Sequence, residues 1–216
     1  MIAVCLLTCD RPELTRLAAQ SFVLHHDGRD DLLALHCDGG SVTDENVQIA
    51  EQYGFLTLVA PPRSERIGQM ATLRRFVEEA VAAQCDWMLW LENDWEFVHA
   101  VPSPEFFRRL SNEGVETVRL FGTQKMKDGH RRLAGIRRIL TRERIDWQPS
   151  SILGWEYGRA HWGAGGTLIQ TDILQRHLHR SRLKDIIKAE NNLRSVRPYV
   201  NLMWCNGLIT TEGILP

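Results

Sequence analysis

The first hundred residues alternate between two hydrophobic patterns. Short, almost uninterrupted apolar runs predict strands at residues 2–7, 32–37, 55–60 and 87–91. Between them, apolar residues recur every three or four positions and predict helices at residues 12–22, 41–53 and 67–81. Pro12 suits a first helical turn, Ser41–Asp44 fits a capping box, and Gly54 suits a helix end. Because strands and helices alternate, we expect an α/β fold with right-handed crossovers and a mainly parallel open sheet.

The second half of the chain has a weaker pattern. It predicts strands at residues 117–121, 167–170, 199–203 and 208–210, and helices from Thr171 onward and at residues 184–193. Residues 124–144 carry eight lysines and arginines, which fit either a solvated loop or a lid that attracts phosphate. No repeat or linker divides the chain, so we expect a single domain over residues 1–216.

Composition narrows the class of protein. A chain of 216 residues that is 44% hydrophobic can bury the core of one large α/β domain. Its formal net charge of -1 argues against nucleic acid as a partner. The five cysteines are scattered, the first apolar run is too short for a signal peptide, and no segment approaches the ~20 apolar residues of a membrane helix. We therefore expect a cytoplasmic protein without a transmembrane segment.

The strongest chemical signal follows the fourth apolar run. That run ends in Glu92 and Asp94, and the carboxyl ends of strands are where open α/β sheets bind ligands. Two acids one residue apart can both reach one hard cation through oxygen. Asp10 and Asp38 follow two other predicted strands, so a parallel sheet would gather these acids at one edge, where a nucleotide and its metal would offset their repulsion. Each acid alone also fits a helix cap or a solvated turn.

The order of these pieces resembles the family 2 glycosyltransferases of the GT-A fold. Three similar segments follow strands: Thr8-Cys9-Asp10-Arg11-Pro12, Cys37-Asp38-Gly39-Gly40-Ser41 and Glu92-Asn93-Asp94. Three more are Gly68 before a helix that bears Arg74 or Arg75, the turn Gly165-Gly166, and Glu190-Asn191 on a late helix. The resemblance runs over nearly the whole chain.

The resemblance implies a sugar transfer, with inversion at the anomeric carbon, from a nucleoside-diphosphate sugar, usually a UDP-sugar, to an acceptor hydroxyl. Residues 1–97 would form the nucleotide-sugar-binding half and residues 98–216 the acceptor-binding half. The resemblance implies contacts with the donor from Thr8, Asp10, Arg11, Asp38, Gly68, Arg74, Glu92, Asn93, Asp94, Gly165 and Gly166.

The resemblance also implies a divalent metal and a catalytic base. Mn²⁺ or Mg²⁺ would be held mainly by Asp94, with Glu92 nearer the ribose or a metal-bound water. By position, Glu190 would take the proton from the acceptor hydroxyl, and Asp172, just past the glycine turn, is a rival base. The acceptor is open among a glycan, a lipid-linked molecule and a protein.

Some departures from the family pattern keep other functions open. Cys37, Glu92 and Asn191 replace the usual aspartates, and Thr211-Glu212-Gly213 stands where the family has a histidine that can bind metal. A catalytically silent nucleotide- or carbohydrate-binding module would tolerate these changes. A nucleotidyltransferase would usually need a basic, glycine-rich loop after the first strand, and Asp10-Arg11-Pro12-Glu13 differs from that pattern.

Overall fold

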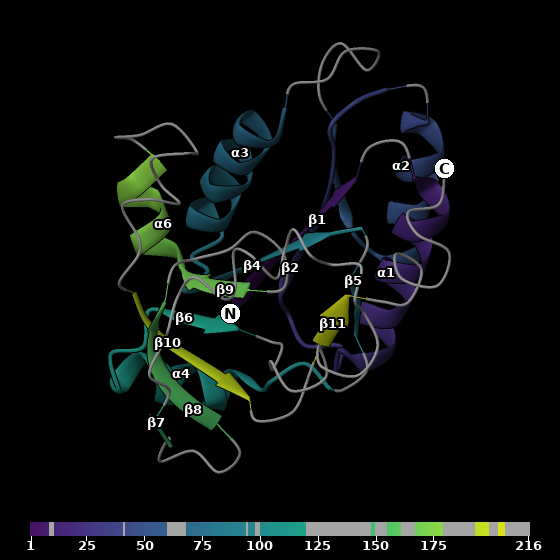
Figure 1. The fold of residues 1–216 in the computed structure, drawn as a ribbon. Coiled ribbons are helices and arrows are strands. Elements are labelled where there is room, and N and C mark those ends of the chain that lie inside the picture. Colours follow the sequence, from purple (N-terminus) through teal and green to yellow (C-terminus); the bar gives the residue numbers. More distant parts are fainter. Residues whose placement is uncertain are drawn as a thin grey trace, which may run out of the picture.

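The protein forms a mixed β-sheet with helices on both faces (Figure 1). The structure, a computed structural model, describes most of the first 119 residues and five shorter stretches after them. The described residues are 1–8, 11–40, 42–59, 68–93, 95–97, 100–119, 148–149, 155–160, 167–178, 193–198 and 203–205.

The first half of the chain has the predicted alternation of strands and helices. Its elements are β1 (Ile2–Thr8), α1 (Pro12–His25), β2 (Leu32–Cys37), α2 (Thr43–Tyr53), β3 (Leu56–Val59), α3 (Gln69–Ala82) and β4 (Trp87–Glu92). Gly54 ends α2 with a φ of 73°, a left-handed conformation that favours glycine. The predicted capping box starts one residue too early, because the N-cap residue of α2 is Val42, whose side chain makes no capping hydrogen bond; Ser41 lies outside the described residues.

The second half contributes shorter elements. They are β5 (Trp95–Phe97), α4 (Pro104–Asn112), β6 (Thr117–Arg119), β7 (Gln148–Pro149), β8 (Trp155–Ala160), β9 (Thr167–Gln170), α6 (Thr171–Leu178), β10 (Leu193–Pro198) and β11 (Met203–Cys205). Among the helices of the described ranges, none is long and apolar enough to cross a membrane.

Several elements of the second half differ from the sequence prediction. Neither α4 nor the strands β8 and β10 are predicted by the hydrophobic pattern. The predicted helix over 184–193 is wrong at its end, because Leu193 begins β10. Of the predicted strand over 199–203, Met203 alone is described, and it lies in β11. The rest of these two segments, the predicted strand over 208–210 and the basic segment 124–144 lie outside the described residues.

The order of strands in the main sheet is β3-β2-β1-β4-β9-β6-β10-β8-β7, and β11 pairs separately with β5. The first four strands are mutually parallel, and β9 and β8 run opposite to the other strands of this sheet. The chain passes from β1 outward to β2 and β3, then crosses back through α3 to β4 on the other side of β1. The strand order therefore reverses between β1 and β4.

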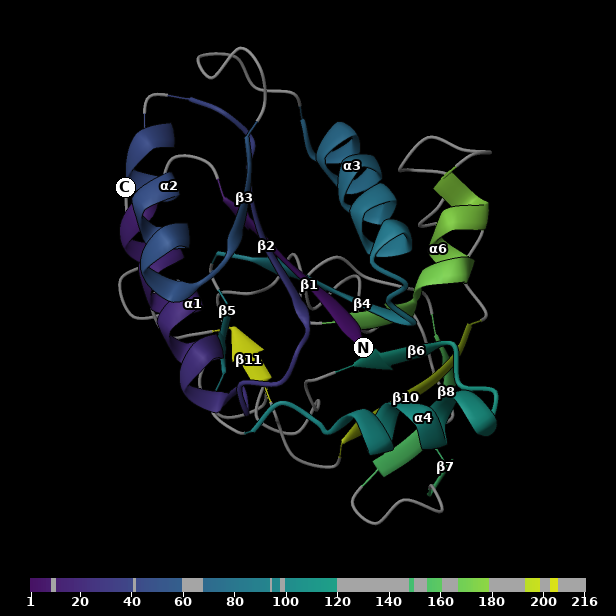
Figure 2. The ribbon, with the colours of Figure 1, turned by 180° about the vertical axis from the view of Figure 1, so that it is seen from behind.

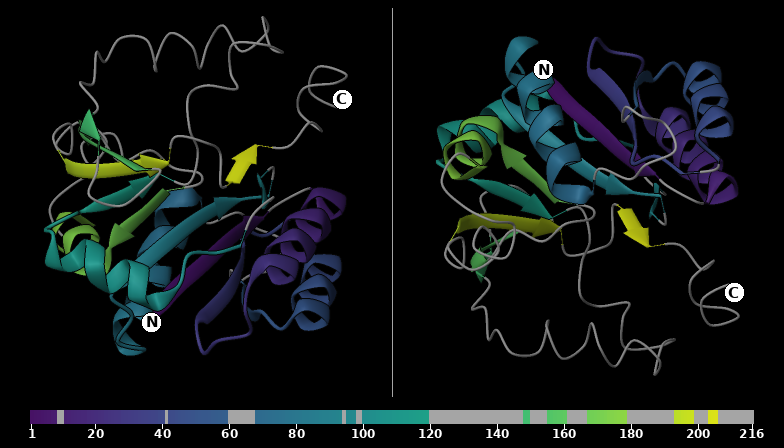
Figure 3. Two further views of the ribbon diagram at one scale, coloured as in Figure 1. Left: turned by 90° about the horizontal axis from the view of Figure 1, so that it is seen from below. Right: turned by 90° about the horizontal axis from the view of Figure 1, so that it is seen from above.

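Alternate residues of the strands pack into two separate cores. Ile2, Val4 and Leu6 of β1 belong to the core beneath α1, α2 and α4. Ala3 and Cys5 belong to the core beneath α3 and α6. Figure 2 shows α1 beside α2 and α3 beside α6, and the two views of Figure 3 show α4 and α3 on opposite sides of the sheet. This sheet, buried on both faces, explains why its central strands are continuous apolar runs.

His36 of β2 is an exception to the apolar core under α3. The residue is 1% exposed, and its ring packs edge-on against Phe76 of α3 with 5.8 Å between the ring centroids. Its Nε2 has no hydrogen-bond partner. Burial and, to a smaller extent, the nearby charge of Arg75 together lower the pKa of His36 from 6.5 to about 4. The imidazole is therefore neutral in the folded protein at pH 7.

We predict that His36 makes the protein less stable in mild acid. Because the pKa of His36 is lower in the folded than in the unfolded chain, unfolding takes up a proton between pH 6.5 and about 4. The contribution is fully present above pH 6.5 and is lost as pH falls, by up to about 3 kcal/mol. Urea unfolding at pH 7, 5.5 and 4 should show a smaller loss in His36→Leu than in the parent.

The matched control is His25→Leu, which alters a partly exposed histidine of α1 and should keep the parent's dependence on pH. An equally steep loss of stability in His36→Leu and in the parent would contradict the assignment to His36.

Candidate functional site

The carboxyl ends of β1, β2 and β4 lie level with one another. Leu7 of β1 pairs with His36 of β2 on one side and with Glu92 of β4 on the other. This edge is also where the strand order reverses between β1 and β4, which in open α/β sheets is the place of a ligand-binding crevice. We call this edge, from Asp38 to Glu92, the switch edge.

Two acidic side chains lie on the same side of the switch edge. Leu7, His36 and Glu92 form one row across the sheet, and Leu7 packs against the core under α3. Side chains alternate between faces, so Asp38, two residues after His36, comes to the same side. One carboxylate oxygen of Asp38 accepts a hydrogen bond of 2.7 Å from the backbone N–H of Gly68, just before α3. Since β1 lies between β2 and β4, His36 and Glu92 stand about 10 Å apart, two strand spacings, and Asp38 follows His36 by two residues.

Gly68 sets the start of α3 at this edge. Its φ of 80° and ψ of 152° lie where glycine is favoured, and a Cβ added there would meet no atom within 4 Å. The requirement for glycine is therefore one of backbone conformation and not of space. The N-terminus of α3 carries positive partial charge, so the predicted Gly68 lies where an anionic group is stabilised.

Of the two arginines proposed from the sequence, Arg75 is the one that faces the sheet. Arg74 is exposed on α3, while Arg75 is half-buried and its charge acts on His36. The turn of the helix explains this difference, because α3 buries Thr72, Leu73, Phe76 and Val77 against β1 and β2. The contact of Arg74 with a donor stays a prediction.

Thr8 lies on the opposite face of the sheet and is 1% exposed. Its hydroxyl is 2.5 Å from the hydroxyl of Thr15 and donates to Oδ1 of Asn46 at 3.3 Å. These contacts fasten the end of β1 to α1 and α2. The structure therefore gives Thr8 a role in holding the edge together and does not present it to a ligand.

Asn93 has a similar role at the end of β4. Its side-chain amide reaches the backbone carbonyl of Arg11 at 3.5 Å and the hydroxyl of Thr15 at 3.4 Å. Asn93 is 9% exposed, whereas Arg11 is exposed. Asn93 thus ties β4 to the start of α1, and Arg11 contributes its carbonyl to that contact and leaves its side chain available.

The structure places Asp172 far from the switch edge. Because β9 runs antiparallel to β4, Gln170 pairs with Trp87 at the amino end of β4. Asp172 follows two residues later and forms an exposed ion pair of 3.1 Å with Arg176. The length of β4, about 17 Å for five residue steps, separates this end from Glu92. Asp172 therefore cannot act as a base on a group bound at the switch edge.

The remaining predicted residues lie outside the described ranges. They are Asp10, Asp94, Gly165, Gly166 and Glu190. Within the described part of the chain, no group of three or more histidine, cysteine, aspartate or glutamate side chains could hold a metal ion. Of the two predicted metal ligands, Glu92 is described, and its half-buried carboxylate at the edge is the oxygen donor that Mn²⁺ or Mg²⁺ prefers.

The sequence prediction missed His36 beneath this edge. The alternation of β2 carries the signal, because Ala34, His36 and Asp38 are spaced two apart and must share one face. The functional consequence is that a buried neutral imidazole, and not an aliphatic side chain, lies under Asp38.

Comparisons with known proteins identify the fold. No protein-family model and none of the curated proteins matches the chain. Among solved structures, S. aureus TarS 1–349 superposes with a TM-score of 0.61 at 12% identity, over 96% of this chain and 60% of that chain. The same protein in complex with UDP gives 0.54 at 10% identity, over 90% and 57% of the two chains. The mannosyltransferase PcManGT from Pyrobaculum calidifontis, in complex with GDP-Man and Mn²⁺, gives 0.55 at 12% identity, over 92% and 55%.

These structures are glycosyltransferases of the GT-A fold, and the present chain shares that fold. The predicted fold class is thereby confirmed. The chain spans between 55% and 60% of the length of these three structures.

We predict that Asp38 holds the start of α3 in place. Asp38→Ala removes the acceptor of the Gly68 N–H and should lower the free energy of unfolding by about 1–3 kcal/mol. The Gly68 amide should also exchange its hydrogen faster, which NMR-detected hydrogen exchange measures. Asp38→Asn keeps an oxygen acceptor and should lose less, and Asp30→Ala, at an exposed aspartate, serves as the control. Unchanged exchange at Gly68 in Asp38→Ala would refute this role.

Proposed function

We propose that the protein is a metal-dependent glycosyltransferase that uses a nucleoside-diphosphate sugar, with a UDP-sugar as the first candidate donor. The observation that carries the proposal is the placement of Asp38 and Glu92 on one side of the sheet, on the two strands that flank β1, at the point where the strand order reverses. The GT-A fold supports it.

The nucleoside would lie across the end of β1. One oxygen of Asp38 accepts from Gly68, and its other oxygen is left to accept a hydrogen bond from the base. Glu92, at the end of β4 on the other side of β1, would accept hydrogen bonds from the ribose hydroxyls, and Asp10 would be a third acidic group at this edge. The exposed Arg11 offers a cation beside the same edge.

Positive charge would offset the negative charge of the diphosphate. The N-terminus of α3 would provide part of it, and a metal ion held by two acidic residues would provide the rest. The N-terminus of α3 stabilises an anion through its unpaired N–H groups. Asp94, with Glu92 beside it, would hold Mn²⁺ or Mg²⁺, which when bound would neutralise charge on the departing diphosphate. The complex of the mannosyltransferase with GDP-Man and Mn²⁺ and that of TarS with UDP support this choice of ligands.

The acceptor hydroxyl needs a base as it attacks the anomeric carbon. Glu190 would take that proton, and attack from the side opposite the diphosphate would invert the configuration at carbon. Asp172 is no longer a candidate, because it lies at the other end of β4. Gly165 and Gly166 would form the acceptor-side turn.

The two halves of the chain would bind different substrates. Residues 1–97 would bind the donor, and residues 98–216 would bind the acceptor, which could be a glycan, a lipid-linked molecule or a protein. We also propose a cytoplasmic location, supported by the free thiols of Cys5, Cys37 and Cys85 in the described core.

We predict that Asp94→Ala abolishes metal-dependent nucleotide binding and leaves the fold intact. The parent should be stabilised by UDP together with Mn²⁺ in a thermal-shift titration, because ligand that binds the folded state raises its stability. The variant should show no such shift.

Asp172→Ala is the matched control, since it removes an exposed aspartate at the opposite end of β4. This control should respond like the parent. An Asp94→Ala variant that keeps the full shift would exclude Asp94 as the metal ligand.

We predict that Glu190→Gln keeps donor binding and loses transfer. Glutamine has nearly the shape of glutamate and cannot accept the proton, so turnover should fall by about 10²-fold or more. Release of UDP from a panel of UDP-sugars in the presence of candidate acceptors measures this. Full transfer by the variant would place the base elsewhere, and a parent that binds UDP and releases none would instead indicate a silent binding module.

A further inference from the structure

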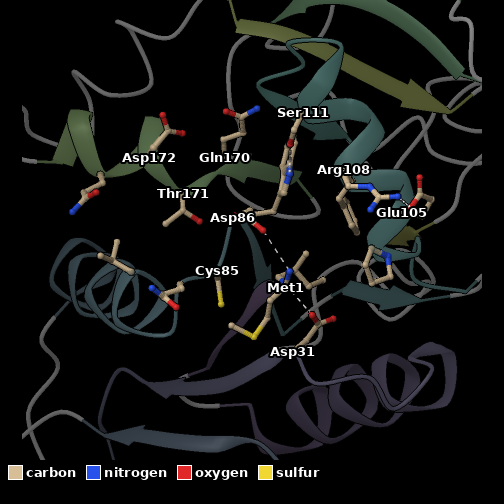
Figure 4. Close-up of a pocket in the computed structure, with 17 residues that line it drawn as sticks. Met1, Asp31, Cys85, Asp86, Glu105, Arg108, Ser111, Gln170, Thr171 and Asp172 are labelled. Atoms are coloured by element: carbon tan, nitrogen blue, oxygen red, sulfur yellow. Dashed lines mark hydrogen bonds and ion pairs between the residues drawn. The ribbon is translucent and has the colours of Figure 1, made fainter.

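A concave site lies at the opposite end of the sheet from the switch edge. It is a pocket of about 810 Å³, within the size range of small-molecule sites, between the amino ends of β1 and β4 and the start of α6 (Figure 4). The pairing of Trp87 with Gln170 brings α6 to this end. Nothing in the proposed transfer reaction uses this pocket, because β4 separates it from Glu92 by about 17 Å.

The pocket contains a buried hydroxyl without a partner. Thr171, the first residue of α6, is 5% exposed, and its Oγ1 makes no hydrogen bond. Its backbone N–H donates to the carbonyl of Asp86 at 2.9 Å, which fixes the residue at the wall of the pocket. In Figure 4, Thr171 and Asp86 face each other there. A buried hydroxyl left unpaired costs free energy, and a ligand that supplies its partner would recover that cost.

The charges around the pocket are balanced in pairs. Asp86 lies 3.5 Å from the amino group of Met1, and Asp172 lies 3.1 Å from Arg176. Glu105 pairs with Arg108, and the buried Asp31 accepts from Arg29 and from the backbone of Ile2. Since each acidic group that lines the pocket has such a partner, the lining offers little net field to attract an ion.

The remaining polar groups are neutral and can both donate and accept. They are the amides of Gln84, Gln170 and Gln175 and the hydroxyls of Ser111 and Thr171. The amide nitrogen of Gln170 already donates to the carbonyl of Val115 at 2.6 Å. The Ser111 hydroxyl already accepts from the Trp87 indole at 3.0 Å, so its own hydrogen is oriented to donate elsewhere. Apolar surface from Ile2, Val81 and Phe107 completes the lining. Neutral hydrogen-bonding groups over an apolar floor suit a ligand with many hydroxyls and an apolar face.

We infer that this pocket binds a neutral carbohydrate at a site separate from the switch edge. The bond that a sugar hydroxyl would make with Oγ1 of Thr171, after a turn of that buried side chain toward the pocket, is its central contact, and the amides of Gln84 and Gln175 would hold neighbouring hydroxyls. The inference does not depend on donor binding or sugar transfer, because none of its residues belongs to the proposed donor site.

The test is an NMR titration of the ¹⁵N-labelled protein with three neutral trisaccharides, maltotriose, cellotriose and chitotriose. At least one should shift the amides of Asp86, Thr171 and Gln175, and should leave those of Asp38 and Glu92 unchanged. Thr171→Val keeps the shape of the side chain and removes its hydroxyl, so it should weaken binding by about fivefold or more. Thr57→Val, on the edge strand β3, is the matched control and should bind like the parent.

Stability separates loss of binding from loss of fold. Since the hydroxyl of Thr171 is unpaired without a ligand, Thr171→Val should unfold no more readily than the parent. The inference is overturned if none of the trisaccharides shifts these amides, or if Thr171→Val binds as tightly as the parent. A response to spermidine and to no sugar would also overturn it, since that would mark a cation site. UDP and Mn²⁺ titrated in parallel report on the donor site alone.

Discussion

The parallel pairing of β1 between β2 and β4 is the constraint on which the rest of the structure depends. This register brings His36, Leu7 and Glu92 into one row and makes the three strands end together. The strand order reverses between β1 and β4 at that edge, which in open α/β sheets is the place of a ligand-binding crevice. The core side chains on both faces hold the register, because a slip by one residue would turn every one of them to the wrong face.

The polar residues at this edge divide into those that join it to the helices and those that we propose face a ligand. Thr8, Thr15, Asn46 and Asn93 bind one another on the side of α1 and α2 and join the ends of β1 and β4 to the helices. Asp38 and Glu92 lie on the other side, toward α3. The buried network holds the backbone from which the two carboxylates project, which is the support that the proposed donor site needs.

The sequence predicted the strands, helices and acidic edge of the first half because each is a local pattern. Apolar runs predict the strands, and in a parallel sheet the carboxyl ends of the strands lie at one edge. The sequence prediction was wrong where contacts between residues distant in the chain determine the position of a side chain. Because β9 is antiparallel to β4, Asp172 lies at the end of the sheet opposite the switch edge. The residues next to Asn93 in the sequence give no sign of its contact with the start of α1. The hydrophobic pattern did not predict α4, whose nine residues make only about two and a half turns. Its start has two ordinary helix signals, since Ser103 caps it and Pro104 is its first residue.

The most direct measurement of the central claim is the position of bound metal nucleotide relative to the sheet. Mn²⁺ is paramagnetic, so in the presence of UDP it broadens the NMR signals of nearby amides. The account predicts broadening that is strongest around Glu92 and Asn93, that reaches Leu7 and Asp38, and that spares Asp86 and Thr171 at the other end of β4. Broadening centred on Asp86 and Thr171, or none that depends on UDP, would contradict it.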